Sequence, residues 1–419
     1  MTPFPSRFFI FFLFAFALIA GAESNPLYGA PSWKTLPSVQ TAFGVTNFEW
    51  DGDSLCFSNE QKVVRFYQGR RKSDVNGTTV WLNAPPYGSV TSGGWRLAST
   101  DLDLLLLSML PKEEGTPKPL RVMLDPGHGG EDDGASSKKP AVREKELVLA
   151  IALRIGEHLA RSGMTVFYTR TNDIALALNE RSALARQNKA DLFISIHANF
   201  ASNSDAAGAE TYALTPSGYS GTTEGSRIRG WQVGNRNDYH NTLLGFSIHS
   251  KLATLPQTFD RGLKRQSFSV LRETSCPAVL IEFGFLSNHA DTLKMLNTNW
   301  QEKCAAVVTE GVSSYAKKVD ALDRAVAERR AREAEANERW RLRLAAQEAA
   351  KSSTSNAPAS SNKTAVVHAD AVAHAFPLPH PPASTATVHT VSAPPSFSTN
   401  MSPLALGTLI DFYATGKTE

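Results

Sequence analysis

The ten residues Arg121-Val-Met-Leu-Asp-Pro-Gly-His-Gly-Gly130 indicate how this chain folds. The apolar run from Val122 to Leu124 is followed by aspartate, proline and glycine, and such a run is typical of a buried strand that ends in a tight turn. His128 is therefore expected at the carboxyl end of a strand, where open α/β sheets place their ligand crevices. A lone histidine in a glycine-rich loop is more often an ordinary polar residue, so the rest of the chain decides its role.

Beyond this strand, the sequence alternates between short apolar runs and longer segments with helical periodicity. Glu144 to Ala160, for example, carries apolar residues at three- and four-residue spacing and ends before Gly163. Further strands are expected at Met164–Thr169, Asp191–His197, Gly208–Leu214 and Cys276–Phe283, and further helices at Asn179–Lys189, Tyr239–Leu255 and Trp300–Lys317. This alternation predicts an α/β fold with a doubly wound, mostly parallel sheet and helices on both faces.

The segments on either side of this pattern differ from it in composition. Residues 23–116 contain short alternating stretches between Gly, Asn, Asp and Pro clusters, with a tight-turn signal at Asn76-Gly77, and predict a small β-rich α+β domain. The α/β domain is assigned to residues 117–317. A solvated charged helix is expected over 318–351, and a disordered tail rich in Ala, Ser and Pro over 352–419.

The N-terminus predicts export. Arg7 precedes a short apolar core that ends in the small residues Ala20-Gly-Ala22, so residues 1–22 have the pattern of a cleaved secretory signal peptide rather than of an uncleaved anchor. No later segment approaches a transmembrane run, so no stable membrane insertion is expected after cleavage. The mature protein is predicted to lie in the periplasm or cell envelope.

Overall composition excludes some classes of protein. An apolar content of 42% and a charged content of 20% describe a globular protein, and a net charge of +3 is too weak to indicate nucleic-acid binding. Three cysteines do not form a disulfide framework, although a bridge between Cys276 and Cys304 remains open. His240 and His249 are expected on the surface of a helix. The tail histidines are interpreted as linker residues: His368, His374, His380 and His389.

Three more residues are candidates for chemistry together with His128. His197 ends a second buried strand, and Glu282 lies inside an apolar strand, where a carboxylate is costly unless it is paired with a metal, a cation or water. Glu144 stands in the first turn of the helix after the His128 loop, where compensation of the helix dipole is the simpler explanation. In a parallel sheet, however, strand ends and helix starts share one edge, so all four side chains can converge there.

Two histidines and one carboxylate are a known zinc-binding set that leaves a fourth position for water. Such an ion makes hydroxide available near neutral pH and polarises a carbonyl, while a second carboxylate can transfer the proton to the leaving amine. The spacing is not of the His-Glu-x-x-His kind, so spacing alone does not prove a metal.

The candidate residues occur within motifs that together resemble the zinc-dependent N-acetylmuramoyl-L-alanine amidases, over residues 120–317. The motifs are Leu124-Asp-Pro-Gly-His-Gly-Gly130, Glu144-Lys-Glu-Leu147, Thr169-Arg170, Ser195-Ile-His-Ala-Asn199 and Pro277-Ala-Val-Leu-Ile-Glu-Phe-Gly-Phe-Leu-Ser-Asn288. The resemblance implies that His128, Glu144 and His197 bind Zn²⁺ and that Glu282 is the catalytic carboxylate. It also implies a peptidoglycan substrate, cleaved between N-acetylmuramic acid and L-alanine.

Two alternatives remain at this point: another secreted zinc amide hydrolase or peptidase, and an inactive wall-binding module that retains the fold. The four intact candidate residues argue against the second. Some relatives carry a long insertion that blocks the zinc until an activator protein binds. Here the interval from Thr215 to Asp238 is short and rich in Gly and Ser, which predicts an open site that requires no activator.

Overall fold

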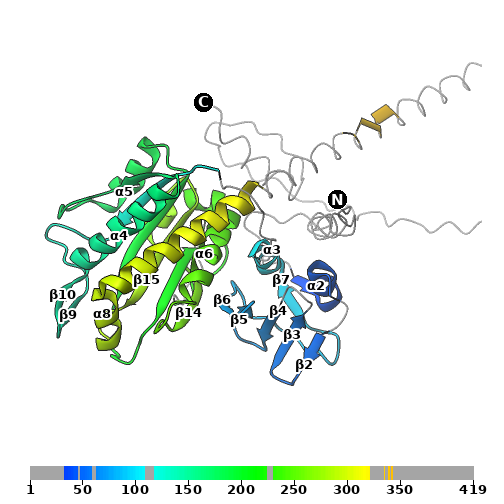
Figure 1. The fold of residues 1–419 in the computed structure, drawn as a ribbon. Coiled ribbons are helices and arrows are strands. Elements are labelled where there is room, and N and C mark those ends of the chain that lie inside the picture. Colours follow the sequence, from blue (N-terminus) through cyan, green and yellow to red (C-terminus); the bar gives the residue numbers. More distant parts are fainter. Residues whose placement is uncertain are drawn as a thin grey trace, which may run out of the picture. The chain divides into compact units, whose positions relative to one another are not determined.

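The structure is a computed structural model that describes residues 33–45, 48–58, 63–108, 118–223 and 230–320, with a few positions between 335 and 342. Within these residues, eleven strands form one sheet in the order β11-β8-β12-β15-β13-β14-β6-β5-β4-β3-β2 (Figure 1). Its first six strands are β11 (Thr165–Tyr168), β8 (Arg121–Pro126), β12 (Leu192–Asn199), β15 (Ala278–Phe285), β13 (Ala209–Leu214) and β14 (Asp260–Gln266).

The pairing of these six strands is mostly parallel. β11, β8, β12 and β15 run parallel to one another, β13 is antiparallel to β15, and β14 is parallel to β13. The predicted fold class is therefore confirmed. β14 is absent from the prediction because Leu263 is its only large apolar residue; its charged side chains Lys264 and Arg265 are buried and paired within the protein instead.

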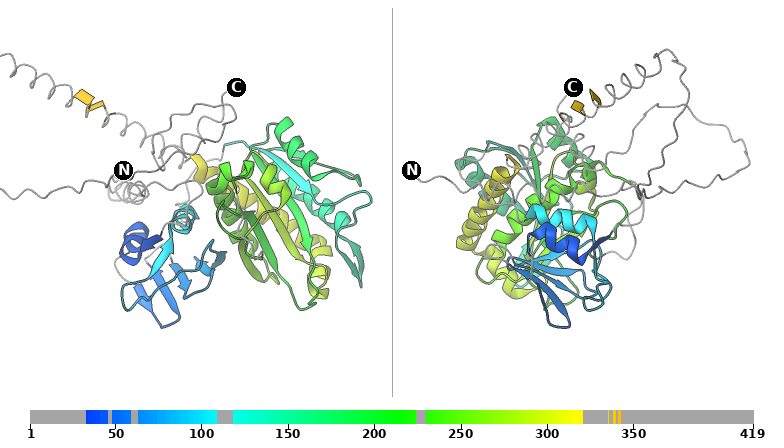
Figure 2. Two further views of the ribbon diagram at one scale, coloured as in Figure 1. Left: turned by 180° about the vertical axis from the view of Figure 1, so that it is seen from behind. Right: turned by 90° about the vertical axis from the view of Figure 1, so that its right-hand side faces the viewer.

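Helices cover both faces of the sheet (Figures 1 and 2). On one face lie α4 (Glu144–Arg161), α6 (Asp238–Leu252) and a helix over 298–320, and on the other α5 (Leu178–Gln187) and the short α7 (Ser269–Glu273). The side chains of β15 alternate accordingly: Val279 and Ile281 pack into the first core, and Leu280 packs into the second. Because strand side chains alternate, Glu282 belongs to the face of Leu280.

The N-terminal β-rich region is built around an aromatic core. Phe57, Phe66 and Trp95 are each 1% exposed and lie in mutual ring contact. The predicted tight turn at Asn76-Gly77 is confirmed, since both residues have positive φ, at 52° and 78°, as a type I′ hairpin turn requires. The elements are β1 (Trp33–Thr35), α2 (Leu36–Phe43), β2 (Phe48–Trp50), β3 (Ser54–Ser58), β4 (Val63–Tyr67), β5 (Lys72–Val75), β6 (Thr78–Trp81), β7 (Arg96–Ala98) and α3 (Ser99–Ser108).

Strand β6 joins this region to the α/β sheet. It runs parallel to β14, with Val80 opposite Leu263. The Thr79 amide donates to Asp260 Oδ2 over 2.8 Å, and the Trp81 indole donates to the Arg261 carbonyl over 3.0 Å. The N-terminal region and the α/β region therefore share one continuous sheet. The domain boundary at residue 117 stays a prediction.

The structure corrects one prediction and leaves others open. His249 is fully buried, with Nδ1 bonded to the Thr211 hydroxyl and Nε2 to Asp260 Oδ1, so its assignment to the surface is wrong. His240 is half-buried beside Tyr315. All three cysteines are unpaired. The predicted signal peptide and tail lie outside the described residues, as does most of the predicted charged helix. No described helix is long and apolar enough to span a membrane.

Candidate metal centre

The loop after β8 holds His128 in a left-handed conformation, with φ of 60°. Such a backbone is uncommon for a residue with a side chain and persists only where its surroundings fix it. Two buried arginines do so here. Arg170 donates to the carbonyls of Pro126 (3.0 Å) and Gly127 (2.6 Å), and Arg181 donates to those of Pro126 (2.9 Å) and His128 (2.8 Å). The loop carbonyls therefore have partners, and the imidazole is presented at the strand end.

Asp125 ties this loop to the neighbouring elements. Its carboxylate is 1% exposed and accepts hydrogen bonds from the Thr169 hydroxyl (2.7 Å), the Arg181 guanidinium (2.8 Å) and the Ser195 hydroxyl (2.8 Å). These donors come from the segment after β11, from α5 and from β12. A buried carboxylate with a full set of donors stabilises one geometry, so Asp125 is a structural residue of the site.

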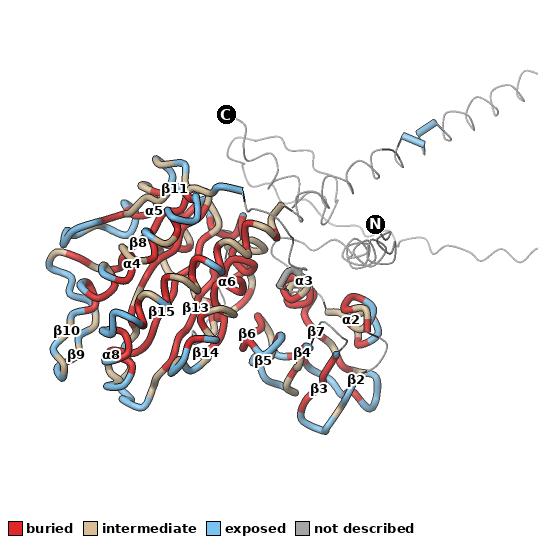
Figure 3. The backbone as a smooth tube through the Cα atoms, in the orientation of Figure 1, coloured by how far each residue is buried: buried red, intermediate tan, exposed pale blue. Residues whose placement is uncertain are grey.

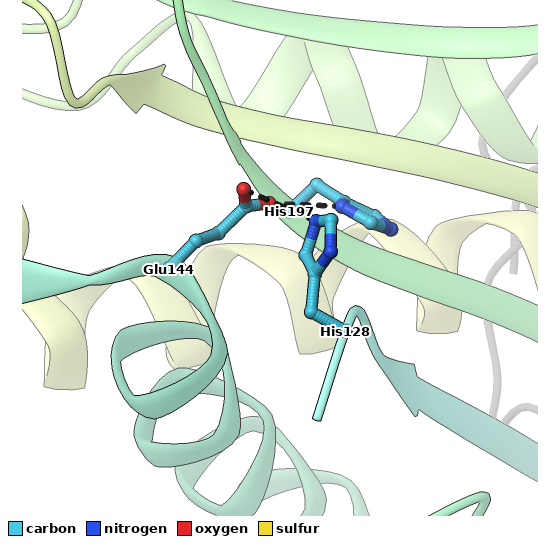
Figure 4. Close-up of side chains that lie close together, drawn as sticks. All are labelled: His128, Glu144 and His197. Carbon is cyan, nitrogen blue, oxygen red and sulfur yellow. Dashed lines mark hydrogen bonds and ion pairs between the residues drawn. The ribbon is translucent and has the colours of Figure 1, made fainter. Parts of the chain in front are cut away.

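Three side chains converge at this edge, as Figure 4 shows. Glu144 Oε1 lies 2.9 Å from His197 Nδ1, and Glu144 Oε2 lies 3.1 Å from His128 Nε2. One ligand atom from each of the three residues falls within 4.8 Å of the others. The two imidazole rings stand nearly perpendicular, with centroids 5.1 Å apart. The convergence expected from the sequence is therefore present for these three residues.

Backbone groups and glycines hold this triangle from behind. Glu144 is 4% exposed and accepts from the amides of Ala135 (2.8 Å) and Ala198 (3.1 Å). A Cβ added at Gly134 would lie 2.6 Å from the His128 ring and 2.7 Å from Glu144 Oε2, and one added at Gly127 would lie 2.2 Å from the His197 ring. Only glycine leaves room for the side chains in these positions.

Asp132 completes the environment of His128, and sequence analysis missed it. Its Oδ2 lies 2.7 Å from His128 Nδ1, and its Oδ1 accepts from the Gly134 amide over 3.0 Å. A carboxylate on the far nitrogen fixes the tautomer and orientation of a metal-binding histidine. Its only sequence signal is an acidic residue four positions after His128.

The following hairpin, β9 (Ser136–Lys138) and β10 (Ala141–Arg143), leads directly into α4 and is largely exposed, unlike the buried β13 and β15 (Figure 3).

Glu282 lies beside the triangle on the neighbouring strand. It is opposite His197 in the β12–β15 register and opposite Glu210 in the β13–β15 register, and it is 9% exposed. Its Oε2 is buried and has no hydrogen-bond partner among the described residues. Burial, followed by repulsion from Glu144 and Glu210, raises the pKa of Glu282 well above its usual range, and Lys264 opposes this only in part. An unpartnered buried carboxylate oxygen is costly, which makes Glu282 a candidate for a chemical role.

The residues present fit a small divalent cation. Two imidazole nitrogens and one carboxylate are the usual ligands of a catalytic zinc with an open position. Burial alone would raise the pKa of Glu144, but hydrogen bonds and charge from the two histidines outweigh it and hold that pKa far below its ordinary value. The unpartnered oxygen of Glu282 lies on the next strand, in register with His197.

The fold and this site together define an α/β protein with a candidate metal centre beside a buried carboxylate, an arrangement suited to hydrolysis. Residues 122–314 match the sequence profile of the N-acetylmuramoyl-L-alanine amidases. The chain belongs to the N-acetylmuramoyl-L-alanine amidase family.

Individual relatives match this part of the chain. An uncharacterised protein of Bacillus subtilis, YqiI, is 37% identical over 194 residues, covering 46% of this chain and 84% of YqiI. The amidase AmiA of Salmonella typhimurium is 31% identical over 229 residues, covering 49% of this chain and 79% of AmiA. The amidase AmiC of Escherichia coli is also 31% identical over 229 residues, and there the match spans only about half of the relative, 55%.

Proposed function

We propose that this chain is an exported zinc-dependent N-acetylmuramoyl-L-alanine amidase that cleaves peptidoglycan between N-acetylmuramic acid and L-alanine. His128, Glu144 and His197 would hold the zinc ion, and Glu282 would act as the general base. The observation that carries the proposal is the unpartnered, buried oxygen of Glu282 on the strand next to His197. Family membership supplies the substrate class.

The chemistry divides between the ion and the protein. A bound zinc ion supplies Lewis-acid polarisation of the amide carbonyl and makes hydroxide available near neutral pH. Glu282 takes the proton of the attacking water on its free oxygen and returns it to the alanine nitrogen as the carbon–nitrogen bond breaks. Asp132 holds the His128 imidazole in position through the nitrogen that faces away from Glu144. The products are a free lactyl carboxylate and a stem peptide with a free amine.

Product analysis tests this proposal. The full chain is incubated with purified sacculi, with and without a chelator, and the soluble products are analysed by mass spectrometry. Intact stem peptides that begin with a free L-alanine amine, released only in the presence of metal, support the amidase. Cleavage inside the stem peptide would instead indicate a peptidase, and no release of peptides or disaccharide peptides would indicate a wall-binding module.

We also propose that the site is open without an activator. The interval from Thr215 to Asp238 follows the end of β13 that lies farther from Glu210. Within this interval, residues 224–229 lie outside the described residues. The purified chain alone should therefore reach its full rate. A clear rise in rate when envelope extract is added, absent from a heat-treated extract, would contradict this.

A further inference from the structure

A β-bulge in β14 aims two basic side chains at one carboxylate. Opposite β13, Ala209 pairs with Asp260 but Thr211 pairs with Leu263, so Glu210 faces two residues of β14, Arg261 and Gly262. Gly262 has φ of 98°. In a regular strand, residues three apart point to opposite faces, but the extra residue of a bulge shifts this alternation. Arg261 and Lys264 consequently both reach Glu210.

Both carboxylate oxygens of Glu210 are occupied, and two basic side chains meet on one of them. Its Oε1 accepts from Arg261 Nε (2.5 Å) and Lys264 Nζ (2.6 Å), and its Oε2 accepts from the Tyr212 hydroxyl (2.5 Å) and Asn199 Nδ2 (3.1 Å). Two cations therefore share one carboxylate. Lys264 is buried, whereas the Arg261 side chain is 30% exposed. No described residue accepts a hydrogen bond from the two terminal nitrogens of Arg261, so the guanidinium can bind an anion from solvent.

This guanidinium lies at the edge of the candidate metal centre. Arg261 reaches back across β13, and its guanidinium carbon is 4.9 Å from the ring centre of Phe285, at the carboxyl end of β15. Arg261 contacts the carboxylate of Glu210 on β13. Glu210 pairs with Glu282 on β15, and Glu282 pairs with His197 on β12. The two strand spacings from β12 to β13 place the guanidinium roughly 10 Å from His197.

We propose that Arg261 binds the free carboxylate of the second stem-peptide residue and so selects peptidoglycan in which that carboxylate is not amidated. This inference rests on the proposed amidase function. The residue after L-alanine is a D-glutamate linked through its side chain, so its α-carboxylate is free unless it has been converted to an amide. Two extended residues span about 7 Å, and a hydrogen bond adds about 3 Å, which matches the separation from the candidate metal centre. A guanidinium with two free nitrogens suits a carboxylate in bidentate geometry.

The N-terminal region holds the bulge that aims Arg261. Thr79 and Trp81 of β6 bond to Asp260 and to the Arg261 carbonyl. β6 also packs tightly on the bulge, because a Cβ added at Gly262 would lie 2.7 Å from Thr79 Cγ2. Trp81 is therefore a positioning residue for Arg261, although it belongs to a region far away in the sequence.

The test compares two disaccharide-peptide substrates that differ only at the second residue, one with D-glutamate and one with D-isoglutamine. The wild-type full chain should show a lower KM for the carboxylate substrate. Arg261→Gln should raise that KM about 10–100-fold and leave the KM for the amide substrate and both kcat values little changed, because the contact is made equally in ground and transition states. Arg261→Lys should retain part of the preference, and Trp81→Phe should reduce it.

A binding measurement separates failure of this inference from failure of the proposed function. Calorimetry with the dipeptides L-alanyl-γ-D-glutamate and L-alanyl-D-isoglutamine requires no turnover, and Arg261→Gln should abolish the preference for the former. Arg186→Gln, an exposed arginine on α5, serves as a matched control that changes neither substrate. Equal effects of Arg261→Gln on both dipeptides, or no effect on either, would overturn the assignment. Absence of hydrolysis of either substrate by the wild type would count against the amidase instead.

Discussion

Substituting Gly127 with alanine tests the geometry of the candidate metal centre most directly. The added Cβ would lie 2.2 Å from Cε1, 2.5 Å from Nε2 and 2.6 Å from Nδ1 of His197. Carbon atoms normally approach to roughly 3.5 Å, so the ring must retreat by about 1 Å. The ring cannot do so freely, because Nδ1 is bonded to Glu144 at 2.9 Å. Gly127 is not among the glycines with positive φ, so alanine adds no backbone strain there.

The expected consequence is loss of metal binding without loss of the fold. Zinc–nitrogen distances tolerate only about 0.2 Å of error, so a displacement of about 1 Å removes one ligand. Disturbing an outer partner costs about 10–100-fold in metal affinity. Moving a ligand itself should cost at least about 100-fold. The Gly127 amide keeps its bond to the Ile196 carbonyl, so thermal unfolding of the metal-free variant should stay close to that of the metal-free wild type.

Zinc affinity is measured by competition with a chromophoric chelator, and amidase activity is followed in parallel. Gly94→Ala is the matched control, because a Cβ there has its nearest neighbour at 3.6 Å, an ordinary contact, and Gly94 also lacks a positive φ. If the zinc affinity of Gly127→Ala lies within about twofold of the wild-type value, the assignment of His197 as a zinc ligand that needs the space left by Gly127 is refuted.

Three other changes test separate parts of the protein. Glu282→Gln should lower the rate of amide hydrolysis by about 10²–10⁴-fold while zinc stays bound; loss of zinc, measured by metal analysis, would show that Glu282 is a ligand. Asp132→Asn should weaken zinc binding about 10–100-fold in the same chelator competition, because the partner of His128 Nδ1 loses its negative charge; unchanged affinity would count against this role. Burial raises the pKa of Asp101 to about 6, although hydrogen bonds from the backbone amides of Asn83 and Ala84 act to lower it. Since an unfolded aspartate ionises near pH 4, the stability from this group is present below about pH 4 and is lost as the pH rises through 6, by up to about 3 kcal/mol. The difference in unfolding free energy between wild type and Asp101→Asn should shrink by that amount between pH 4 and 7, in urea titrations with chelator present; an equal difference at both pH values would contradict it.

The sequence predicts those parts of the fold in which apolar periodicity and burial agree. β8, β12 and β15 are apolar runs, and each ends beside a polar residue of the site, so His128 and His197 could be placed at one edge of the sheet. Glu144 and Glu282 could be placed there as well, because helix starts and strand ends meet at that edge in a parallel sheet.

Features that depend on contacts between distant residues could not be predicted. β14 is buried, but its charged side chains are paired with Glu210 and Thr242, and no local pattern shows this. His249 lies on α6, which is buried on nearly all sides, so its sequence shows no division into a buried and an exposed face. The partners of His249, Thr211 and Asp260, come from two different strands. The role of Arg170 likewise becomes visible only once the loop carbonyls turn toward it.

The pairing of β6 with β14 has a consequence for biosynthesis. Trp81 and its partner Arg261 are 180 residues apart, so at ribosomal rates of about 5–20 residues per second the first strand is made roughly 10–35 s before the second. During that interval the nascent chain presents an open strand edge, which is a template for association with other chains. The same edge would be exposed permanently in a chain truncated before Asp260. A chaperone that shields extended segments should therefore raise the yield of this protein more than that of a variant whose β6 edge carries a proline.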